Sequence, residues 1–315
     1  MKKIAIIGSG VMGHGIGQLY AQHNSDVTMY DLNDQALDKA REMISDSLSA
    51  MKEKEIITDE DIRNTFSHLT FTTDLSEAVK GAEMVVEVVP EVLDLKHKVY
   101  RQIEEVVSDD TIIASNTSAI PLTELVEDAS HPERFIITHY FAPAQIIPLV
   151  EIIQLEGKTK PELLEKVQKY LKSCGKSPIV LKKEVPGFIA NRMQMALMRE
   201  AFWLYENGIA SAEDIDTVLK DSIGFRYVFL GPLEGQDIAG IGTTYNVSKK
   251  LFPVLDDRKE PHPFLQEMMD NNTVGIRSNK GFYEYTEESG KEKIRRRNDN
   301  FLEVFKLRQK QQGNK

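Results

Sequence analysis

The sequence predicts an α/β fold, in which a doubly wound, mostly parallel sheet is followed by an all-helical C-terminal domain. Three observations lead to this prediction. The first half of the chain alternates short apolar runs with helical stretches, the first run ends in a glycine-rich turn, and the pattern beyond residue 185 is helical. Such alternation is typical of a parallel sheet with helices on both faces. A length of 315 residues suits two domains.

Short runs rich in Val and Ile are predicted to form the strands. The clearest runs cover residues 4–7, 27–30, 84–89, 111–114 and 135–138. Two further strands are expected at residues 149–153 and 179–181. Between the runs lie helical stretches with a polar face, such as residues 16–22 and 95–107.

The pattern changes around Val185-Pro186-Gly187, and we place the domain boundary there. Residues 1–185 are the predicted doubly wound (Rossmann) domain, and residues 186–315 are the predicted helical domain. Within the second domain, residues 188–207 and 212–222 form long helical patterns. Residues 188–205 carry more apolar surface than one amphipathic face requires, which we assign mainly to core and secondarily to an interface.

Composition excludes several classes of function. The net charge of −10 argues against a nucleic-acid partner for the bulk of the surface. No apolar run approaches the roughly eighteen residues needed to cross a bilayer, so no membrane association is expected. The first ten residues read as a strand and not as a signal peptide, which makes the cytoplasm the expected location. A single cysteine, Cys174, excludes an internal disulfide and a multi-cysteine metal site.

The C-terminal segment differs in charge from the rest of the chain. Residues 291–315 hold nine Lys or Arg against three Asp or Glu, a local net charge of +6. We expect a solvated terminal helix whose buried stripe contains Phe301, Leu302, Phe305 and Leu307. A nucleic-acid or membrane role of this tail is the minor alternative.

The first predicted strand ends in a G-x-G-x-x-G motif, Gly8-Ser9-Gly10-Val11-Met12-Gly13. The motif follows a strand and opens a helix, the context in which it binds a dinucleotide. Gly8 permits the tight turn, Gly10 lets the backbone approach a pyrophosphate, and Gly13 lets helix and strand pack closely. The alternative, a tight turn without a ligand, does not account for this context.

Asp31 follows the second predicted strand, where an acid binds the adenosine ribose hydroxyls. Its charge repels a 2′-phosphate, and neither Leu32 nor Asn33 is basic, so NAD is the predicted cofactor. Other ligand motifs fail. Gly175-Lys176-Ser177 is similar to the end of a phosphate-binding loop, but Tyr170 stands where that loop needs its first glycine. No metal-ligand spacing is present, and no metal is expected.

His139 is the candidate general base among seven histidines, because it ends the apolar strand at residues 135–138. Ligand crevices in open α/β sheets lie at the carboxyl ends of strands. Glu151 follows twelve residues later inside the apolar run 149–153, where an unpaired carboxylate is costly to bury. Pairing with His139 offsets that cost and orients the ring, although spacing alone leaves the pairing open.

Several segments resemble the L-3-hydroxyacyl-CoA dehydrogenase family, in the family's order and spacing, from residue 1 to about residue 285. They are the glycine motif with Gly15-Ile16, Val86-Glu87-Val88-Val89-Pro90-Glu91, Ser115-Asn116-Thr117-Ser118, His139-Tyr140-Phe141-Ala142-Pro143 with Leu149-Val150-Glu151, Pro186-Gly187-Phe188-Ile189-Ala190-Asn191-Arg192, Gly231-Pro232 and Gly281-Phe282-Tyr283.

The resemblance implies a role for each matched position. His139 is implied to be the general base and Glu151 its orienting carboxylate. Ser118 and Asn191 are implied to hold the reacting oxygen or His139. The implied contacts to the nicotinamide half of the cofactor are Glu91, Lys96 and Asn116. Without the resemblance, Ser118 and Asn191 read as caps and Lys96 as a solvated helix charge.

Two departures from the family pattern concern the substrate. The signature His-Phe-Phe-Asn-Pro has Ala142 in place of its asparagine, and the segment 224–230 before Gly231-Pro232 is bulky and basic. The second feature is similar to branches related to L-carnitine dehydrogenase, L-gulonate dehydrogenase and lambda-crystallin. Residues 40–68 supply Arg41, Lys52, Lys54 and Arg63 where acyl-CoA enzymes have a helical CoA-binding arm, together with many acids.

The predicted function is therefore NAD-dependent interconversion of an L-3-hydroxyacyl-CoA and a 3-ketoacyl-CoA, in fatty acid metabolism. The same chemistry on a small free hydroxy acid such as L-carnitine or L-gulonate is the alternative. A catalytically silent NAD-binding sensor or structural protein is an alternative of another class, against which the His139–Glu151 pair argues. The resemblance also implies a homodimer formed through the helical domain.

Overall fold

The computed structural model describes residues 1–313, with side chains as far as residue 310. The chain divides into two compact units. The first contains Met1–Ile189 together with the chain from Arg296 onward, and the second contains Ala190–Arg295. Along residues 1–313, no helix is both long enough and apolar enough to cross a membrane.

The first unit is built on one eight-stranded sheet in the order β3-β2-β1-β4-β5-β6-β7-β8. Neighbouring strands run parallel except β6 and β7, which are antiparallel. This doubly wound arrangement confirms the predicted fold class. The strands are β1 (Lys3–Ile7), β2 (Asp26–Tyr30), β3 (Leu69–Thr72), β4 (Met84–Glu87), β5 (Ile112–Ser115), β6 (Phe135–Tyr140), β7 (Leu149–Ile153) and β8 (Ser177–Val180).

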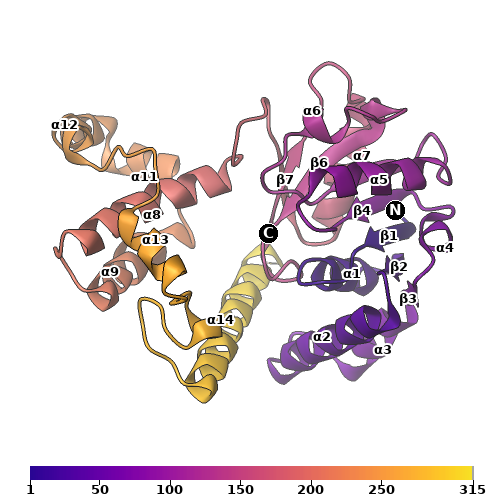
Figure 1. Cartoon of the computed structure of the whole chain (residues 1–315), viewed down its shortest axis with the longest axis horizontal. Coiled ribbons are helices and arrows are strands. Elements are labelled where there is room, and N and C mark those ends of the chain that lie inside the picture. The colour runs from indigo at the N-terminus through magenta and orange to yellow at the C-terminus, as the bar shows by residue number, and fades with distance from the viewer. Residues whose placement is uncertain (314–315) are drawn as a thin grey trace. The chain divides into compact units, whose positions relative to one another are not determined.

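Helices cover both faces of this sheet (Figure 1). Successive strand residues enter different cores: Ile4 and Ile6 belong to one apolar cluster, and Ala5 and Ile7 to the other. Burial on both faces explains why these strands read as continuous apolar runs. The helices of this unit are α1 (Gly13–Gln22), α2 (Asp34–Glu53), α3 (Asp59–Ser67), α4 (Leu75–Val79), α5 (Leu93–Glu104), α6 (Leu122–Leu125) and α7 (Pro161–Ser173).

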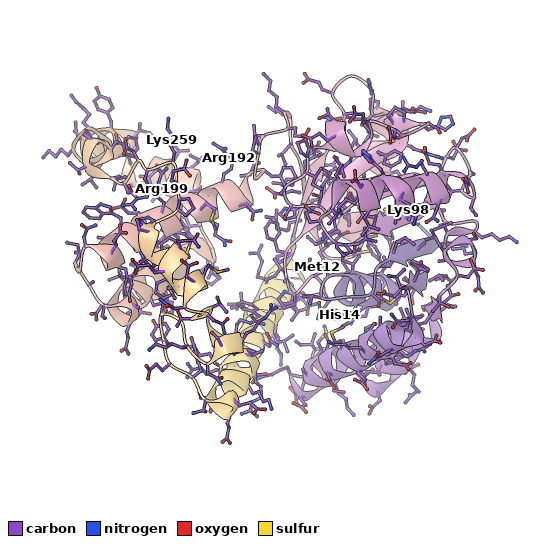
Figure 2. The ribbon with its side chains drawn as sticks, viewed as in Figure 1. Met12, His14, Lys98, Arg192, Arg199 and Lys259 are labelled. Atoms are coloured by element: carbon purple, nitrogen blue, oxygen red, sulfur yellow. The ribbon has the colours of Figure 1, made fainter. Side chains whose placement is uncertain are left out.

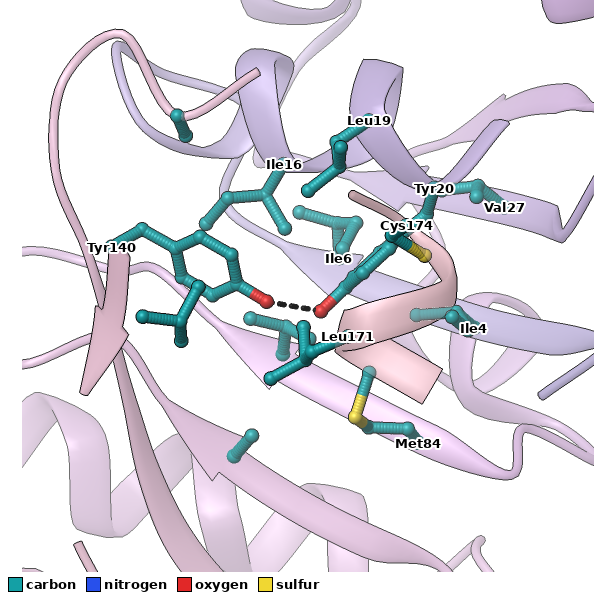
Figure 3. Packing of buried hydrophobic residues seen from close by; sticks show 14 of the residues in the cluster. Ile4, Ile6, Ile16, Leu19, Tyr20, Val27, Met84, Tyr140, Leu171 and Cys174 are labelled. Atoms are coloured by element: carbon teal, nitrogen blue, oxygen red, sulfur yellow. Dashed lines mark hydrogen bonds between the residues drawn. The ribbon is translucent and has the colours of Figure 1, made fainter. Parts of the chain in front are cut away.

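One core contains a buried hydrogen bond between Tyr20 of α1 and Tyr140 of β6 (Figure 3). Both rings are almost fully buried, and burial is the main cause that raises the pKa of each phenol. The two hydroxyls therefore stay protonated and satisfy each other. This contact ties the end of β6, next to His139, to the helix that opens after the glycine motif.

The second unit is helical, as predicted. Its helices are α8 (Ala190–Glu206), α9 (Ala212–Val218), α10 (Phe225–Tyr227), α11 (Pro232–Ala239), α12 (Ile241–Leu251) and α13 (Pro263–Asp270). The helix predicted over residues 188–207 starts at Ala190, because Phe188 has a φ of 51° that a helix does not allow, and its ring is buried in the first unit. Within the stretch 188–205, the expected core role is therefore confirmed for Phe188 and wrong for α8, none of whose residues is buried.

The last helix, α14 (Glu287–Gly313), confirms the predicted terminal helix. Its residues up to Arg295 group with the second unit and those from Arg296 with the first. Leu302 is 2% exposed and packs with Met51 and Ile146, while Phe301 and Phe305 are partly buried around them. The stripe ends there, since Leu307 is 42% exposed and does not belong to it. Because of this packing, the chain from Arg296 onward groups with the first unit, which differs from the predicted single domain over 186–315.

Candidate active site

The glycine motif forms a tight loop between β1 and α1 that leaves room for a ligand. Gly8 has a φ of +104°, and a Cβ there would lie 2.8 Å from the Val88 carbonyl oxygen. A Cβ on Gly13 would lie 1.9 Å from the Gly8 oxygen, so that only glycine allows helix and strand to meet. A Cβ on Gly10 would meet nothing within 4 Å. The open face above Gly10 fits the predicted approach of a pyrophosphate to the backbone.

Asp31 lies at the end of β2 and is anchored to the same loop. Its Oδ2 accepts hydrogen bonds from the Ser9 backbone N–H at 2.8 Å and from the Ser9 hydroxyl at 2.7 Å, and its Oδ1 accepts from the Leu32 N–H at 2.8 Å. The carboxylate is thus held where the second strand ends, beside the glycine loop. Val11 is 71% exposed in this loop, and Met12 is partly buried against the core. The glycine loop and the Asp31 carboxylate together fit the pyrophosphate and the adenosine ribose of NAD.

His139 and Glu151 face each other across β6 and β7. The imidazole Nδ1 lies 2.9 Å from Glu151 Oε2, and the exposed fractions are 5% for the histidine and 0% for the glutamate. Since a carboxylate only accepts, the Nδ1 carries the shared hydrogen and Nε2 is left to exchange a proton. The other oxygen, Glu151 Oε1, accepts from the Ile189 N–H at 2.9 Å. The structure thus brings together the pair that spacing left open.

Two aromatic rings flank the His139 imidazole. The centroid of Phe141 lies 4.5 Å away and that of Phe188 lies 5.4 Å away. These rings limit the access of water to the imidazole, which strengthens the interaction of its charged form with Glu151.

Glu91 holds the loop that carries Ser118. Its carboxylate accepts hydrogen bonds from the Thr117 hydroxyl, from the Ser118 N–H at 3.1 Å and from the Ala119 N–H at 3.3 Å. Burial raises the pKa of Glu91, but the bond from Thr117 and the charge of Lys96 outweigh it, so its pKa is below the ordinary value. Glu91 therefore acts as a charged anchor for the backbone of Ser118, whose side chain is exposed.

Lys96 is 1% exposed and bridges two carboxylates. Its Nζ lies 2.7 Å from Glu87 Oε1 and 3.2 Å from Glu91 Oε2, and it also donates to the Val89 carbonyl at 3.4 Å. All three ammonium hydrogens thus have protein acceptors. Lys96 thus forms a buried bridge between Glu87 and Glu91 and is not a solvated charge, while its contact with the nicotinamide half of the cofactor stays a prediction.

Glu87 is the functional-site residue that sequence reasoning missed. It is 0% exposed at the end of β4 and also accepts from the Val89 N–H at 2.8 Å, the Tyr100 hydroxyl at 2.5 Å and the Ser115 hydroxyl at 2.7 Å. With Lys96, four donors satisfy this carboxylate, as a buried charge requires. The available signal was an acid inside the apolar run 84–89, the same argument that singled out Glu151.

Asn116 links the ends of β5 and β6. Its Oδ1 accepts a hydrogen bond from the Tyr140 N–H at 3.0 Å, next to His139. The amide nitrogen is therefore the part of this side chain that can donate to a ligand. Asn191 belongs to the second unit, where it lies in the first turn of α8. Its role in the site stays a prediction.

The loop between β6 and β7, residues 141–148, is held by Lys176, which sequence reasoning also missed. Lys176 Nζ donates to the Ala144 carbonyl at 2.6 Å and to the Ile147 carbonyl at 2.8 Å, and the residue is 6% exposed. Burial lowers the pKa of Lys176 to about 7. On the other side of the loop, Gln145 donates to the Ser47 hydroxyl at 2.9 Å and its side-chain oxygen lies beside Gly15 of α1. This loop connects the strands that carry His139 and Glu151, and Lys176 holds two of its carbonyls.

The helices α2 and α3 form an arm between β2 and β3 whose cations already have partners. Lys52 Nζ lies 2.6 Å from Asp59 Oδ1, Lys54 Nζ lies 3.1 Å from Glu303 Oε1, and the Arg41 guanidinium lies 3.7 Å from the Phe71 ring centroid. Lys306 of α14 donates to the Lys54 carbonyl at 2.8 Å. The far end of this arm is therefore covered by α14.

Among the described side chains, no group of three or more His, Cys, Asp or Glu residues could hold a metal ion. A doubly wound sheet, a glycine loop with an acid at the next strand, and a buried imidazole–carboxylate pair define an NAD-dependent oxidoreductase. A model of the 3-hydroxyacyl-CoA dehydrogenase NAD-binding domain matches residues 3–185, and the model of the C-terminal domain of that family matches residues 187–285. The chain belongs to the 3-hydroxyacyl-CoA dehydrogenase family.

Relatives within this family differ in the substrates they are named for. The chain is 38% identical over 291 residues to 5-formyl-3-hydroxy-2-methylpyridine 4-carboxylate 5-dehydrogenase of Mesorhizobium japonicum, covering 92% of this chain and 93% of the relative. It is 32% identical over 292 residues to the mitochondrial hydroxyacyl-coenzyme A dehydrogenase of Homo sapiens, covering 90% and 91%. It is 35% identical over 243 residues to L-carnitine dehydrogenase of Oceanobacillus iheyensis, covering 76% of each.

A solved structure is similar over nearly the whole chain. It is the crystal structure of a 5-formyl-3-hydroxy-2-methylpyridine 4-carboxylic acid 5-dehydrogenase, described as an NAD⁺-dependent dismutase. It matches with a TM-score of 0.90 at 35% identity and covers 98% of both chains.

Proposed function

We propose that this protein oxidises a hydroxyl group to a carbonyl, reversibly, with His139 as the general base. The observation that carries the proposal is the buried His139–Glu151 pair, with Nδ1 and Oε2 2.9 Å apart. His139 Nε2 takes the hydroxyl proton as the carbon–hydrogen bond of the substrate breaks. The Glu151 carboxylate stabilises the imidazolium formed in this step and keeps its ring in place.

The bound NAD supplies a hydride acceptor at nicotinamide C4. The glycine loop at residues 8–13 and Asp31 bind its adenosine half, and we assign Glu91 and Asn116 to its nicotinamide half. Lys96 holds Glu91 through the bridge described above. Ser118 and Asn191 donate to the reacting oxygen, which gains negative charge as the proton leaves.

For the substrate, we propose a small free carboxylic acid that carries the hydroxyl or carbonyl group. Three of the four cations predicted to bind CoA phosphates already lie near acids of this chain: Arg41 near Asp38, Lys52 near Asp59 and Lys54 near Glu303. The C-terminal helix α14 covers the end of the arm that carries them. The pyridine carboxylate dehydrogenases named above are similar over 92–98% of this chain, which supports the same substrate class.

The hydrated form of an aldehyde fits the same site. A hydrate presents a hydroxyl and a hydrogen on one carbon, so that loss of the proton to His139 and of hydride to NAD yields a carboxylic acid. The proposal therefore includes aldehyde acids, in which the product gains a second carboxylate.

An L-3-hydroxyacyl-CoA is the second candidate, and the family match over residues 3–285 favours it. Arg63 of α3 is the arm cation for which a phosphate of CoA is the natural partner. A place in fatty acid metabolism goes with this candidate. For either substrate, we propose a homodimer formed through the helical unit and a cytoplasmic location.

One substrate panel tests both candidates. NADH absorbance is followed with acetoacetyl-CoA, L-carnitine, L-gulonate and a pyridine aldehyde carboxylate as substrates. Turnover of a free acid at a kcat/KM well above that of acetoacetyl-CoA supports the proposal. Efficient reduction of acetoacetyl-CoA with no oxidation of free acids overturns the substrate class and leaves the role of His139 standing. Arg63→Ala is the matched variant: it should leave KM for a free acid unchanged, and it should raise KM for a CoA ester if the arm binds CoA.

A further inference from the structure

His14 is a histidine of the glycine loop that the proposed reaction does not use. It is the second residue of α1, directly after Gly13, and its side chain lies next to Met12 at the start of this helix (Figure 2). Its Nδ1 lies 2.9 Å from the Gly10 carbonyl oxygen. The loop is open to the dinucleotide at Gly10. The imidazole therefore contacts the backbone at the position proposed to bind the cofactor.

The contact with Gly10 fixes the tautomer of the ring. A carbonyl oxygen only accepts, so Nδ1 carries a hydrogen, and Nε2 of the neutral ring is an unprotonated acceptor. Burial lowers the pKa of His14, and the bond to Gly10 opposes this effect only in part. The positive end of the α1 dipole acts in the same direction as burial. Without cofactor, His14 is therefore neutral at pH 7.

We propose that His14 binds a proton when the dinucleotide binds, so that its imidazolium becomes a cationic contact of the pyrophosphate. The two negative charges of a pyrophosphate beside the loop favour a cation at Nε2, while Nδ1 keeps its bond to Gly10. Cofactor affinity is then coupled to pH by this residue. The inference rests on NAD binding and is independent of the substrate.

Neighbouring charged groups do not replace this role. Asp31, the acid beside the glycine loop, accepts hydrogen bonds from Ser9 and Leu32. Lys176 has a pKa of about 7 and faces the Ala144 and Ile147 carbonyls of the β6–β7 loop, which packs on α1 through Gly15. Among the described residues, no charged side chain contributes to the pKa of His14. Lys176 is thus the group that needs a control.

The sign of the coupling follows from the two states. His14 has a lowered pKa in the free protein and a raised one in the complex, so the complex holds more protons between these values. Affinity rises as the pH falls through that window and is constant above it. Since one pKa unit corresponds to a tenfold change in binding, we expect Kd to rise about three- to tenfold from about pH 5.5 to about pH 8.

The experiment measures binding and not turnover. Titration calorimetry with ADP-ribose, in buffers of different ionisation enthalpy near pH 6.5, should show net proton uptake. Adenosine, which lacks the phosphates, should show none. Equal uptake with both ligands, or uptake with neither, overturns the proposal without any variant.

Variants assign the proton to its residue. His14→Gln keeps a donor for the Gly10 carbonyl and should abolish both the uptake and the pH dependence of Kd. His23→Gln is the matched control, because His23 Nδ1 makes the same contact with the carbonyl four residues earlier, Leu19, at 2.7 Å, but at the other end of α1. His23→Gln and Lys176→Met should retain the uptake. Uptake that persists in His14→Gln, or that disappears in either control, contradicts the assignment.

Discussion

Glu151 accepts a hydrogen bond from His139 across β6 and β7, which are the antiparallel neighbours of an otherwise parallel sheet within residues 1–313. Residues directly opposite each other on antiparallel strands project to the same side of the sheet, so their side chains can contact each other. Parallel neighbours cannot place two residues only twelve positions apart in this way, because they need a long crossover. The local reversal of strand direction thus creates the proposed catalytic pair.

The first prediction concerns this pair. His139→Gln should lower kcat by about a hundred- to ten-thousandfold, because a positioned general base contributes that much, with NADH affinity nearly unchanged. Glu151→Gln should have an equal or milder effect on kcat. Near-wild-type turnover of His139→Gln, measured by NADH absorbance, is the outcome that contradicts the mechanism.

Asp31 gives a prediction about cofactor choice. Asp31→Ser removes the charge that repels a 2′-phosphate and the acceptor for ribose hydroxyls, so NAD should bind more weakly and the gap to NADP should narrow. Asp31→Asn is the control for the loop, since it can keep a bond to Ser9 while losing the charge. Binding is measured as Kd for both reduced cofactors by fluorescence. Equal use of NAD and NADP by the wild type would falsify this reading.

The Lys96–Glu87 pair gives a prediction about stability. Lys96→Met leaves the fully buried Glu87 carboxylate without its cation, and breaking one side of a buried pair costs about 3–5 kcal/mol. The free energy of unfolding is measured in urea. The double variant Glu87→Gln with Lys96→Met should recover part of the loss, because no buried charge remains at that end of β4. A double variant no more stable than Lys96→Met argues that the charge is not the cause.

How far the sequence determines this site depends on the kind of contact. The strands and the glycine loop were predictable because a continuous apolar run and a turn motif are local signals. The strand β3 (Leu69–Thr72) was missed because it has only four residues, of which two are polar, and because it lies at the edge of the sheet. Contacts such as Lys176 with Ala144 and Ile147 were not predictable, because they join segments about thirty residues apart through backbone carbonyls that carry no sequence signal.

Lys176 gives a prediction about pH. Its pKa in the folded protein is about 7, below the ordinary value of 10.5, because it is buried. Between these values the unfolded chain binds more protons at this residue, so its contribution makes the free energy of unfolding rise with pH from about 7 to about 10.5. Urea unfolding of the wild type and Lys176→Met at both ends of this window measures the difference. The free energy of unfolding of the wild type should rise with pH relative to that of Lys176→Met, and a difference that does not change with pH contradicts the assignment.

The last prediction concerns the attachment of α14 to the arm. Leu302 is 2% exposed between Met51 and Ile146, so Leu302→Ala removes buried methyl groups and should cost about 2–5 kcal/mol of stability in the first unit. Leu307→Ala is the matched control on the same helix, because Leu307 is 42% exposed and its change should stay within about 0.5 kcal/mol. Urea unfolding gives both values. If α14 keeps CoA from the arm, Leu302→Ala should also loosen this cover and lower KM for a CoA ester relative to Leu307→Ala. Equal stabilities of the two variants would show that α14 does not pack on the arm in solution.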